Sequence, residues 1–133
     1  MSDFNEKNNV SIDPAAFAVA EQEAAAPKND IGVYTHIFKK PFTCLVGTEE
    51  KTFEQLDFDF NKLTGQDSLS IENELQALGK PVIVAEMSGE YLLRMAARAC
   101  SVKISADDLA AMPLGDYNKI RSRARSFLLR SGS

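Results

Sequence analysis

Histidine and cysteine, which often bind metal ions or carry nucleophilic chemistry, are scarce among the 133 residues of this chain. The one histidine, His36, stands in a strand-like stretch without a second imidazole or a thiol at ligand spacing, so we expect no metal site. It is expected to be a surface or hydrogen-bonded core residue, with catalysis or metal binding as the alternative. Cys44 and Cys100 lie far apart and form no Cys-x-x-Cys motif. In a cytoplasmic chain they are expected to be small apolar residues rather than a disulfide or redox pair.

Long hydrophobic runs are also lacking. The longest apolar stretch, residues 81–85, is far shorter than the ~18 residues of a membrane span. The first residues, Met-Ser-Asp-Phe-Asn-Glu, have neither the basic start nor the apolar core of a secretory signal. We therefore expect a cytoplasmic protein without a membrane partner.

Motifs that carry chemistry are lacking as well. The isolated glycines near expected helix ends build no phosphate loop, and no serine stands in a nucleophile elbow. Asp57 and Asp59 could bind a hard cation or act as acid and base. They alternate with Leu56, Phe58 and Phe60, however, which indicates a half-buried strand with the two carboxylates on its solvent-exposed face. The sequence predicts no enzyme and no cofactor.

Charge is unevenly distributed along the chain, whose formal net charge is −4. Residues 49–90 contain 10 acidic residues against 3 lysines, a local net of −7. In residues 114–133, Asp116 opposes five basic residues, a local net of +4. This asymmetry favours either head-to-tail self-association into a homo-oligomer or a basic end that meets an acidic partner.

Residues 1–30 are expected to be a flexible tail. They combine polar residues, two prolines and an alanine-glutamate run with few large apolar side chains, which cannot offset the entropy lost on ordering. From residue 31 the pattern becomes β-branched and aromatic. Residues 33–38, 42–46 and 53–60 read as three short strands separated by turns, which predicts a small antiparallel β-meander.

A helical period follows. Thr64 with Asp67 resembles a capping box and begins a first helix, which Gly79 and Pro81 end. Its expected apolar stripe is narrow and consists of Ile71, Leu75 and Leu78. Residues 82–87 are either a short strand or a lead-in to the next helix.

The second helix begins at Ser88 and is expected to be central, because its apolar residues cover about half of the helix circumference. Glu90, Arg94 and Arg98 line its remaining side as a solvated ladder. Ser105 caps a short third helix that Pro113 stops, and a final helix starts at Asp116. The sequence thus predicts one α+β domain over residues 31–130, with a β part in 31–60 and about four helices in 64–130.

The final helix is the one feature with evident binding potential. Its apolar face consists of Tyr117, Ile120, Ala124, Phe127 and Leu128. On a helical wheel Arg121 and Arg125 border one side of this face, and Lys119, Arg123 and Arg130 border the other. Charges beside an apolar seam suit a helix that docks on a protein, whereas a nucleic-acid site more often gathers them on one face. The candidate partner-binding residues are Arg121, Arg123, Arg125, Phe127 and Leu128, and a merely solvated helix is the alternative.

Several motifs in this order resemble the tail assembly chaperones of contractile-tailed phages of the Mu and P2 types. They are Leu63-Thr-Gly-Gln-Asp67, an acidic helix ending in Leu78-Gly79, Glu90-Tyr-Leu-Leu-Arg-Met-Ala-Ala-Arg-Ala99, Ser105-Ala-Asp-Asp-Leu109, Met112-Pro-Leu-Gly-Asp-Tyr117 and Ser126-Phe-Leu128. The resemblance spans residues 31–129. Each motif alone is an ordinary cap or apolar face, so the resemblance rests on their order and spacing.

The resemblance implies a non-enzymatic assembly factor in the host cytoplasm that is absent from the mature virion. Such chaperones bind the aggregation-prone tape measure protein and keep it soluble while tail tube subunits polymerise. A frameshifted longer form often contacts the tail tube protein. The alternatives are a small nucleic-acid-binding regulator, which the charge of −4 and the split arginines disfavour, and a permanent structural subunit of the tail.

Overall fold

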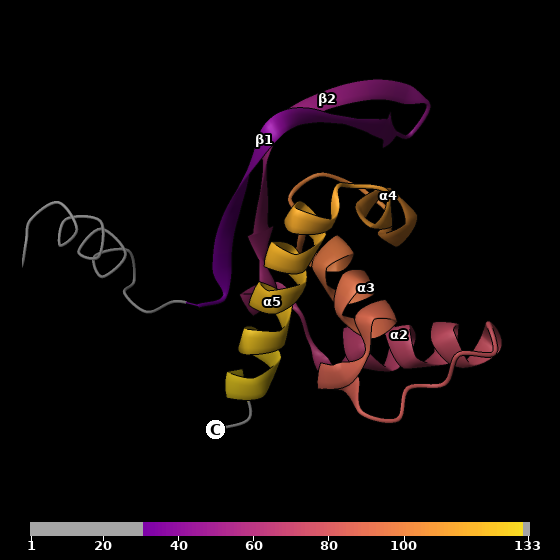
Figure 1. Ribbon diagram of the computed structural model, residues 1–133. Coiled ribbons are helices and arrows are strands. Elements are labelled where there is room, and N and C mark those ends of the chain that lie inside the picture. The colour runs from indigo at the N-terminus through magenta and orange to yellow at the C-terminus, as the bar shows by residue number, and fades with distance from the viewer. Residues whose placement is uncertain (1–30, 132–133) are drawn as a thin grey trace, which may run out of the picture. The chain divides into compact units, whose positions relative to one another are not determined.

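The computed structural model describes residues 31–131, which form a two-stranded antiparallel hairpin followed by four α-helices (Figure 1). This confirms the predicted α+β class. The flexible tail predicted for residues 1–30 lies outside the described residues.

The hairpin consists of β1 (Val33–Val46) and β2 (Glu49–Asp59). Gly47, at φ 70°, supplies the left-handed conformation that the tight turn needs. The predicted three-stranded meander is wrong, because the first two predicted strands form one continuous strand. Between Ile37 and Phe42 the register shifts, so that β1 carries extra residues opposite β2. Pro41 lies in this bulge, where its missing amide interrupts no ladder hydrogen bond.

The first α-helix of the described residues, α2 (Gly65–Ala77), follows a 3₁₀ turn at Phe60–Lys62. Thr64 and Asp67 form the predicted capping box, in which each side chain accepts a hydrogen bond from the other residue's backbone amide. Gly79, at φ 76°, follows the end of the helix. Ile71 and Leu75 are buried as predicted, but Leu78 is 56% exposed because it lies past the last turn.

Helix α3 (Gly89–Ala99) is central, as predicted, and packs against α2, α4 and α5. Ser88 caps its N-terminus through the backbone amide of Tyr91, and a 3₁₀ turn at Ala85–Met87 leads into it, so residues 82–87 form no strand. The predicted solvated ladder on α3 holds for Glu90 and Arg98, which are exposed, but not for Arg94. Arg94 is only 12% exposed and binds Glu74 of α2 at 2.8 Å and Glu90 at 2.6 Å, while Arg98 binds Asp67 at 2.8 Å.

Helices α4 (Ala106–Ala110) and α5 (Leu114–Ser131) complete the described chain. Ser105 and Asp108 form the predicted capping box of α4. Helix α5 begins two residues before the predicted start at Asp116, because the carbonyl of Pro113 accepts a hydrogen bond from Tyr117 and closes the first turn. Figure 1 shows α5 and α3 next to each other, with the far end of the hairpin extending past the top of α5.

The core joins the hairpin to the helices. Phe58 and Phe60 stack with ring centroids 6.1 Å apart, and both are fully buried among residues of α2, α3 and α5. Among the described residues both cysteines are free thiols; Cys100 is buried and Cys44 is partly buried. Burial raises the pKa of both thiols, which keeps them protonated at neutral pH.

Candidate functional site

A hydrogen-bonded trio ties the start of the hairpin to the start of α5. The side chain of His36 on β1 is 1% exposed, and its Nε2 lies 2.7 Å from Oδ1 of Asp116 on α5. Its Nδ1 lies 2.8 Å from the hydroxyl of Tyr34. Since Asp116 is an acceptor, a neutral His36 carries its proton on Nε2 and accepts from the Tyr34 hydroxyl at Nδ1. Both ring nitrogens are therefore engaged, and His36 is the hydrogen-bonded core residue that the sequence allowed.

Tyr34 is held as a neutral phenol. Partial burial raises its pKa, the positive charge of Arg123 lowers it, and the negative charge of Asp116 raises it again. Its ring also stacks on the Phe58 ring, with centroids 6.2 Å apart. The ring is thus held by its packing against Phe58 in the core, and its hydroxyl is held by the hydrogen bond to His36.

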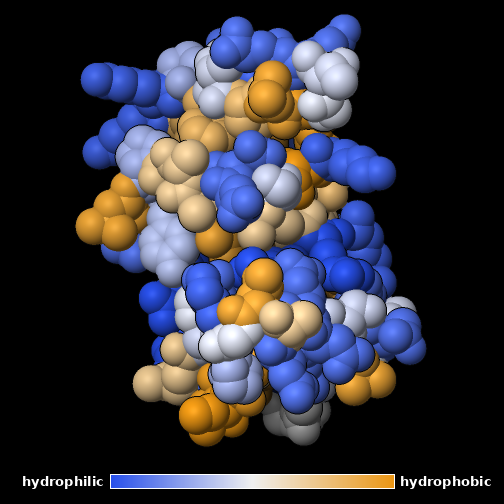
Figure 2. Space-filling view, turned by 90° about the vertical axis from the view of Figure 1, so that its right-hand side faces the viewer, coloured by the Kyte–Doolittle hydropathy of each residue, from blue (hydrophilic) through white to orange (hydrophobic). Residues whose placement is uncertain are grey.

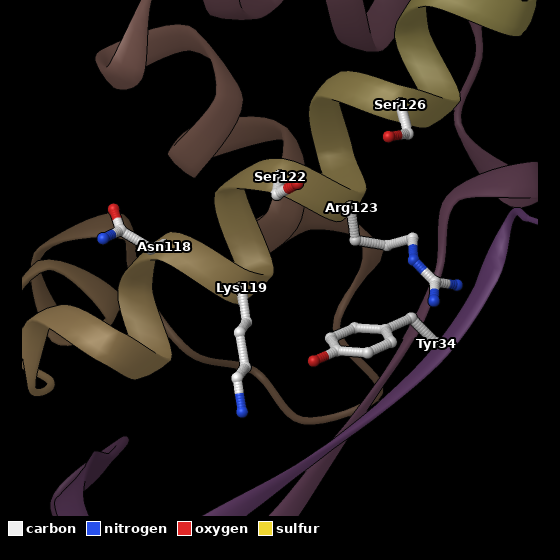
Figure 3. Close-up of a pocket in the computed structure, with 6 residues that line it drawn as sticks. All are labelled: Tyr34, Asn118, Lys119, Ser122, Arg123 and Ser126. Atoms are coloured by element: carbon white, nitrogen blue, oxygen red, sulfur yellow. The ribbon is translucent and has the colours of Figure 1, made fainter.

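An open hollow of about 350 Å³ lies beside Tyr34, between β1 and the polar side of α5. We call it the α5 hollow; its lining residues are Tyr34, Asn118, Lys119, Ser122, Arg123 and Ser126. In Figure 3 Lys119 and Arg123 both extend from α5 toward β1, with the Tyr34 ring between them in that view. The five residues from α5 recur at helical spacing and therefore share one side of the helix.

Arg123 is oriented by contacts with β1. The carbon of its guanidinium lies 4.5 Å from the centroid of the Tyr34 ring, a cation–π geometry, and Nη1 donates to the backbone carbonyl of Val33 at 3.3 Å. Within residues 31–131, neither Arg123 nor Lys119 has a carboxylate within ion-pair distance. The hollow therefore carries two positive charges without an ion-pair partner among residues 31–131.

The five predicted partner-binding residues do not form one site. Arg121 donates to the Tyr117 hydroxyl at 3.4 Å, and Arg125 donates to the backbone carbonyl of Glu86 at 3.2 Å. Both therefore lie toward the segment that enters α3, whereas Arg123 lies toward β1. This is the division that the helical wheel predicted.

Phe127 and Leu128, the other two predicted residues, are partly buried against the core. The Phe127 ring stacks on Phe60 with centroids 5.6 Å apart. Most of their contact surface thus belongs to the domain itself. The next residue, Leu129, is 50% exposed and points to a different side of the helix.

A second hollow, of about 590 Å³, lies between α3, α4 and α5. Leu93, Met112 and Tyr117 contribute apolar surface to it, and Arg94 and Glu90 contribute charge. Glu90 is already bound by Arg94 and by Lys80, and these contacts hold the pKa of its carboxyl below the usual range. The Glu90 carboxylate of this hollow is therefore already paired with both of the hollow's cations, Lys80 and Arg94.

Sequence reasoning missed Tyr34, Asn118, Ser122 and Ser126 as lining residues. The signal for the helical ones was the recurrence of polar residues at positions 118, 119, 122, 123 and 126. Nothing local marked Tyr34. In the described part of the chain, no three His, Cys, Asp or Glu side chains are grouped to hold a metal ion. Nor is any helix of residues 31–131 long and apolar enough to cross a membrane.

No known protein family, curated protein or solved structure matches this chain. The resemblance to tail assembly chaperones therefore rests on the motifs of the sequence alone.

Proposed function

We propose that this protein is a non-enzymatic tail assembly chaperone, which binds the tape measure protein of a contractile-tailed phage and keeps it soluble during tube assembly. The observation that carries the proposal is a series of exposed apolar side chains on the connection between α2 and α3. We call it the connection surface; it consists of Leu78 (56% exposed), Ile83 (90%), Val84 (45%) and Met87 (65%).

The connection surface is held in place by the rest of the domain. Val82 and Ala85 pack partly buried against the core, so their neighbours are directed outward. Arg125 of α5 bonds the Glu86 carbonyl, and the cap at Ser88 fixes the entry into α3. Figure 2 shows one face of the molecule, on which hydrophobic residues gather in separate groups among hydrophilic ones.

The physical basis of the proposal is the burial of apolar surface. Each large apolar side chain that moves from water into an interface contributes roughly 1.5–3 kcal/mol before the cost of association is subtracted. A tape measure protein exposes long apolar helical seams in water, and an anchored apolar surface can cover such a seam. Residues on a fixed backbone lose less conformational freedom on binding than residues on a mobile loop.

The proposal expects a tape measure protein in the same phage, and co-expression of the two proteins tests it. We expect the tape measure protein to become soluble and to co-purify. Ile83→Glu should abolish both effects, because a carboxylate would be buried in the interface. Ile37→Glu, at a 69% exposed position on the outer face of β1, is the matched control and should retain both. A tape measure protein that stays insoluble with the unaltered chain would refute the proposal.

The place of the protein in assembly distinguishes this proposal from a permanent structural subunit. A chaperone is absent from the finished particle although it is abundant in the host cytoplasm. Mass spectrometry of purified virions should therefore detect none of it, while a stoichiometric amount would support the structural subunit. A frameshifted longer form that contacts the tail tube protein would appear as a second product in the infected cell.

A further inference from the structure

We propose that the α5 hollow binds the carboxylates of an acidic segment of the partner protein. This inference deepens the proposed function and rests on it, but it concerns a different surface from the connection surface. It would explain why the chain places unneutralised cations beside an ordered tyrosine.

The α5 hollow brings together two cations that have no carboxylate partner within the described domain. Lys80, Arg94 and Arg98 are each within 3.2 Å of a carboxylate of the same domain. Lys119 and Arg123 have no such partner among residues 31–131, and neither have other basic residues such as Lys103. What sets Lys119 and Arg123 apart is that both line the α5 hollow, and that Arg123 is oriented there by Tyr34. Arg123 uses one hydrogen bond to Val33, and a guanidinium has five N–H groups, so most of its donors remain available for a ligand.

The second step concerns preorganisation. Asp116 orients His36, His36 orients the Tyr34 hydroxyl, and the Tyr34 ring supports the Arg123 guanidinium. An oriented guanidinium loses less side-chain freedom when it binds a carboxylate than a solvated one does. The trio thus acts as a support for the cation that would contact the ligand.

Spacing defines the ligand further. Lys119 and Arg123 are four residues apart on α5, as are Ser122 and Ser126, so a row of cations runs beside a row of hydroxyls. Neighbours at this spacing lie roughly 5–6 Å apart. Two carboxylates at the same separation occur at positions i and i+4 of a helix, or at alternate residues of an extended chain. The expected ligand is therefore a segment with glutamates repeated at one of these intervals.

An acidic protein segment fits this site better than a nucleic acid. A phosphate backbone presents a long row of charges, which proteins usually meet with a clustered stripe of basic residues. The hollow offers two cations, Lys119 and Arg123, and no longer stripe of them. A short acidic segment needs no more than these two contacts.

Fluorescence anisotropy with the full chain tests the inference. The probe is a labelled peptide of repeated Glu-Ala-Ala-Ala units, and the same peptide with glutamine in place of glutamate is the control ligand. The unaltered protein should bind the glutamate peptide and not the glutamine peptide. Lys119→Glu and Ser122→Glu, both at exposed helical positions, should each weaken binding by about tenfold or more through charge repulsion. Lys103→Glu, an exposed charge reversal away from the hollow, should leave binding unchanged.

Each outcome decides the question. Equal binding by the unaltered protein and both hollow variants would overturn the inference, and so would tighter binding of a DNA or RNA oligonucleotide at the same salt concentration. Circular dichroism of each variant confirms that it is folded. If Lys119→Glu and Ser122→Glu solubilise the tape measure protein normally, the hollow has no such role while the proposed function stands. If the unaltered chain fails to solubilise that protein but binds the peptide, the proposed function fails and the acidic-ligand site remains.

Discussion

Replacing Asp116 by alanine removes the side chain that accepts the hydrogen bond from Nε2 of His36 at 2.7 Å. His36 is 1% exposed and the Asp116 side chain 16% exposed, so water cannot readily take the place of the lost carboxylate. The donor would remain buried without a partner. The His36 trio also joins β1 to α5 across 80 residues of sequence, so the perturbation reaches both halves of the domain.

The size of the effect follows from two contributions. A buried donor left unpaired costs about 1–3 kcal/mol, and a hydrogen bond to a charged group contributes at the upper end of that range. Asp116 also lies in the first turn of α5, where a negative charge interacts favourably with the helix dipole by about 0.3–1 kcal/mol. We expect Asp116→Ala to lower the free energy of unfolding by about 2–3 kcal/mol. For a domain of this size that corresponds to a decrease of roughly 10–20 °C in Tm.

Urea denaturation followed by circular dichroism measures the loss, with Asp116→Asn as the matched variant. Asparagine retains an acceptor oxygen for Nε2 and loses only the charge, so we expect a cost of about 1 kcal/mol. A double variant, His36→Phe with Asp116→Ala, should recover part of the loss, because both polar groups are then removed together. A loss below about 0.5 kcal/mol for Asp116→Ala would refute the argument that this hydrogen bond joins the two halves.

Three further predictions concern stability. Phe127→Ala should lower the free energy of unfolding by about 2 kcal/mol, less than the loss at a fully buried phenylalanine, because this ring is only partly buried. Leu129→Ala, at a 50% exposed position, should change the free energy of unfolding by less than about 0.5 kcal/mol in the same denaturation assay. The pKa of Asp67 is lowered by the backbone amide of Thr64 and by Arg98, and the pKa of Glu90 is lowered by Arg94. The stability that these two carboxylates contribute should therefore be complete at neutral pH and lost on acidification below about pH 4. A variant with Asp67→Asn and Glu90→Gln should accordingly show a flatter decrease of Tm with falling pH. Ser88→Ala should lower the free energy of unfolding by about 1 kcal/mol, since it removes the acceptor that caps α3, and an unchanged urea midpoint would contradict this role.

The helices were predictable because their signals are local. Thr64, Ser88 and Ser105 each cap a helix through an amide within three residues, so both partners stand together in the sequence. The alternation from Leu56 to Phe60 likewise separated the buried face of β2 from its wet face. These features depend on the period of one element, not on how the elements are packed.

The errors concern contacts between distant segments. Lys39, Lys40 and Pro41 read as a break between strands, yet β1 continues through them because the bulge needs no ladder bond there. Arg94 read as solvated because its neighbours on α3 are charged, but α2 covers it and supplies Glu74 as a partner. The α5 hollow could not be predicted for the same reason, since its tyrosine and its helical residues are far apart in the sequence.

The bulge in β1 has a consequence for how this protein behaves at high concentration. A two-stranded hairpin has two outer edges, and a long regular edge with free amides and carbonyls can recruit strands from other chains into ordered aggregates. In β1 the positions between Ile37 and Phe42 interrupt the regular ladder with two lysines and a proline. The lysines repel a second strand of the same charge, and the proline has no backbone N–H to donate to it. The edge is thus divided into two short pieces, each less able to template fibril growth than an uninterrupted strand of the same length.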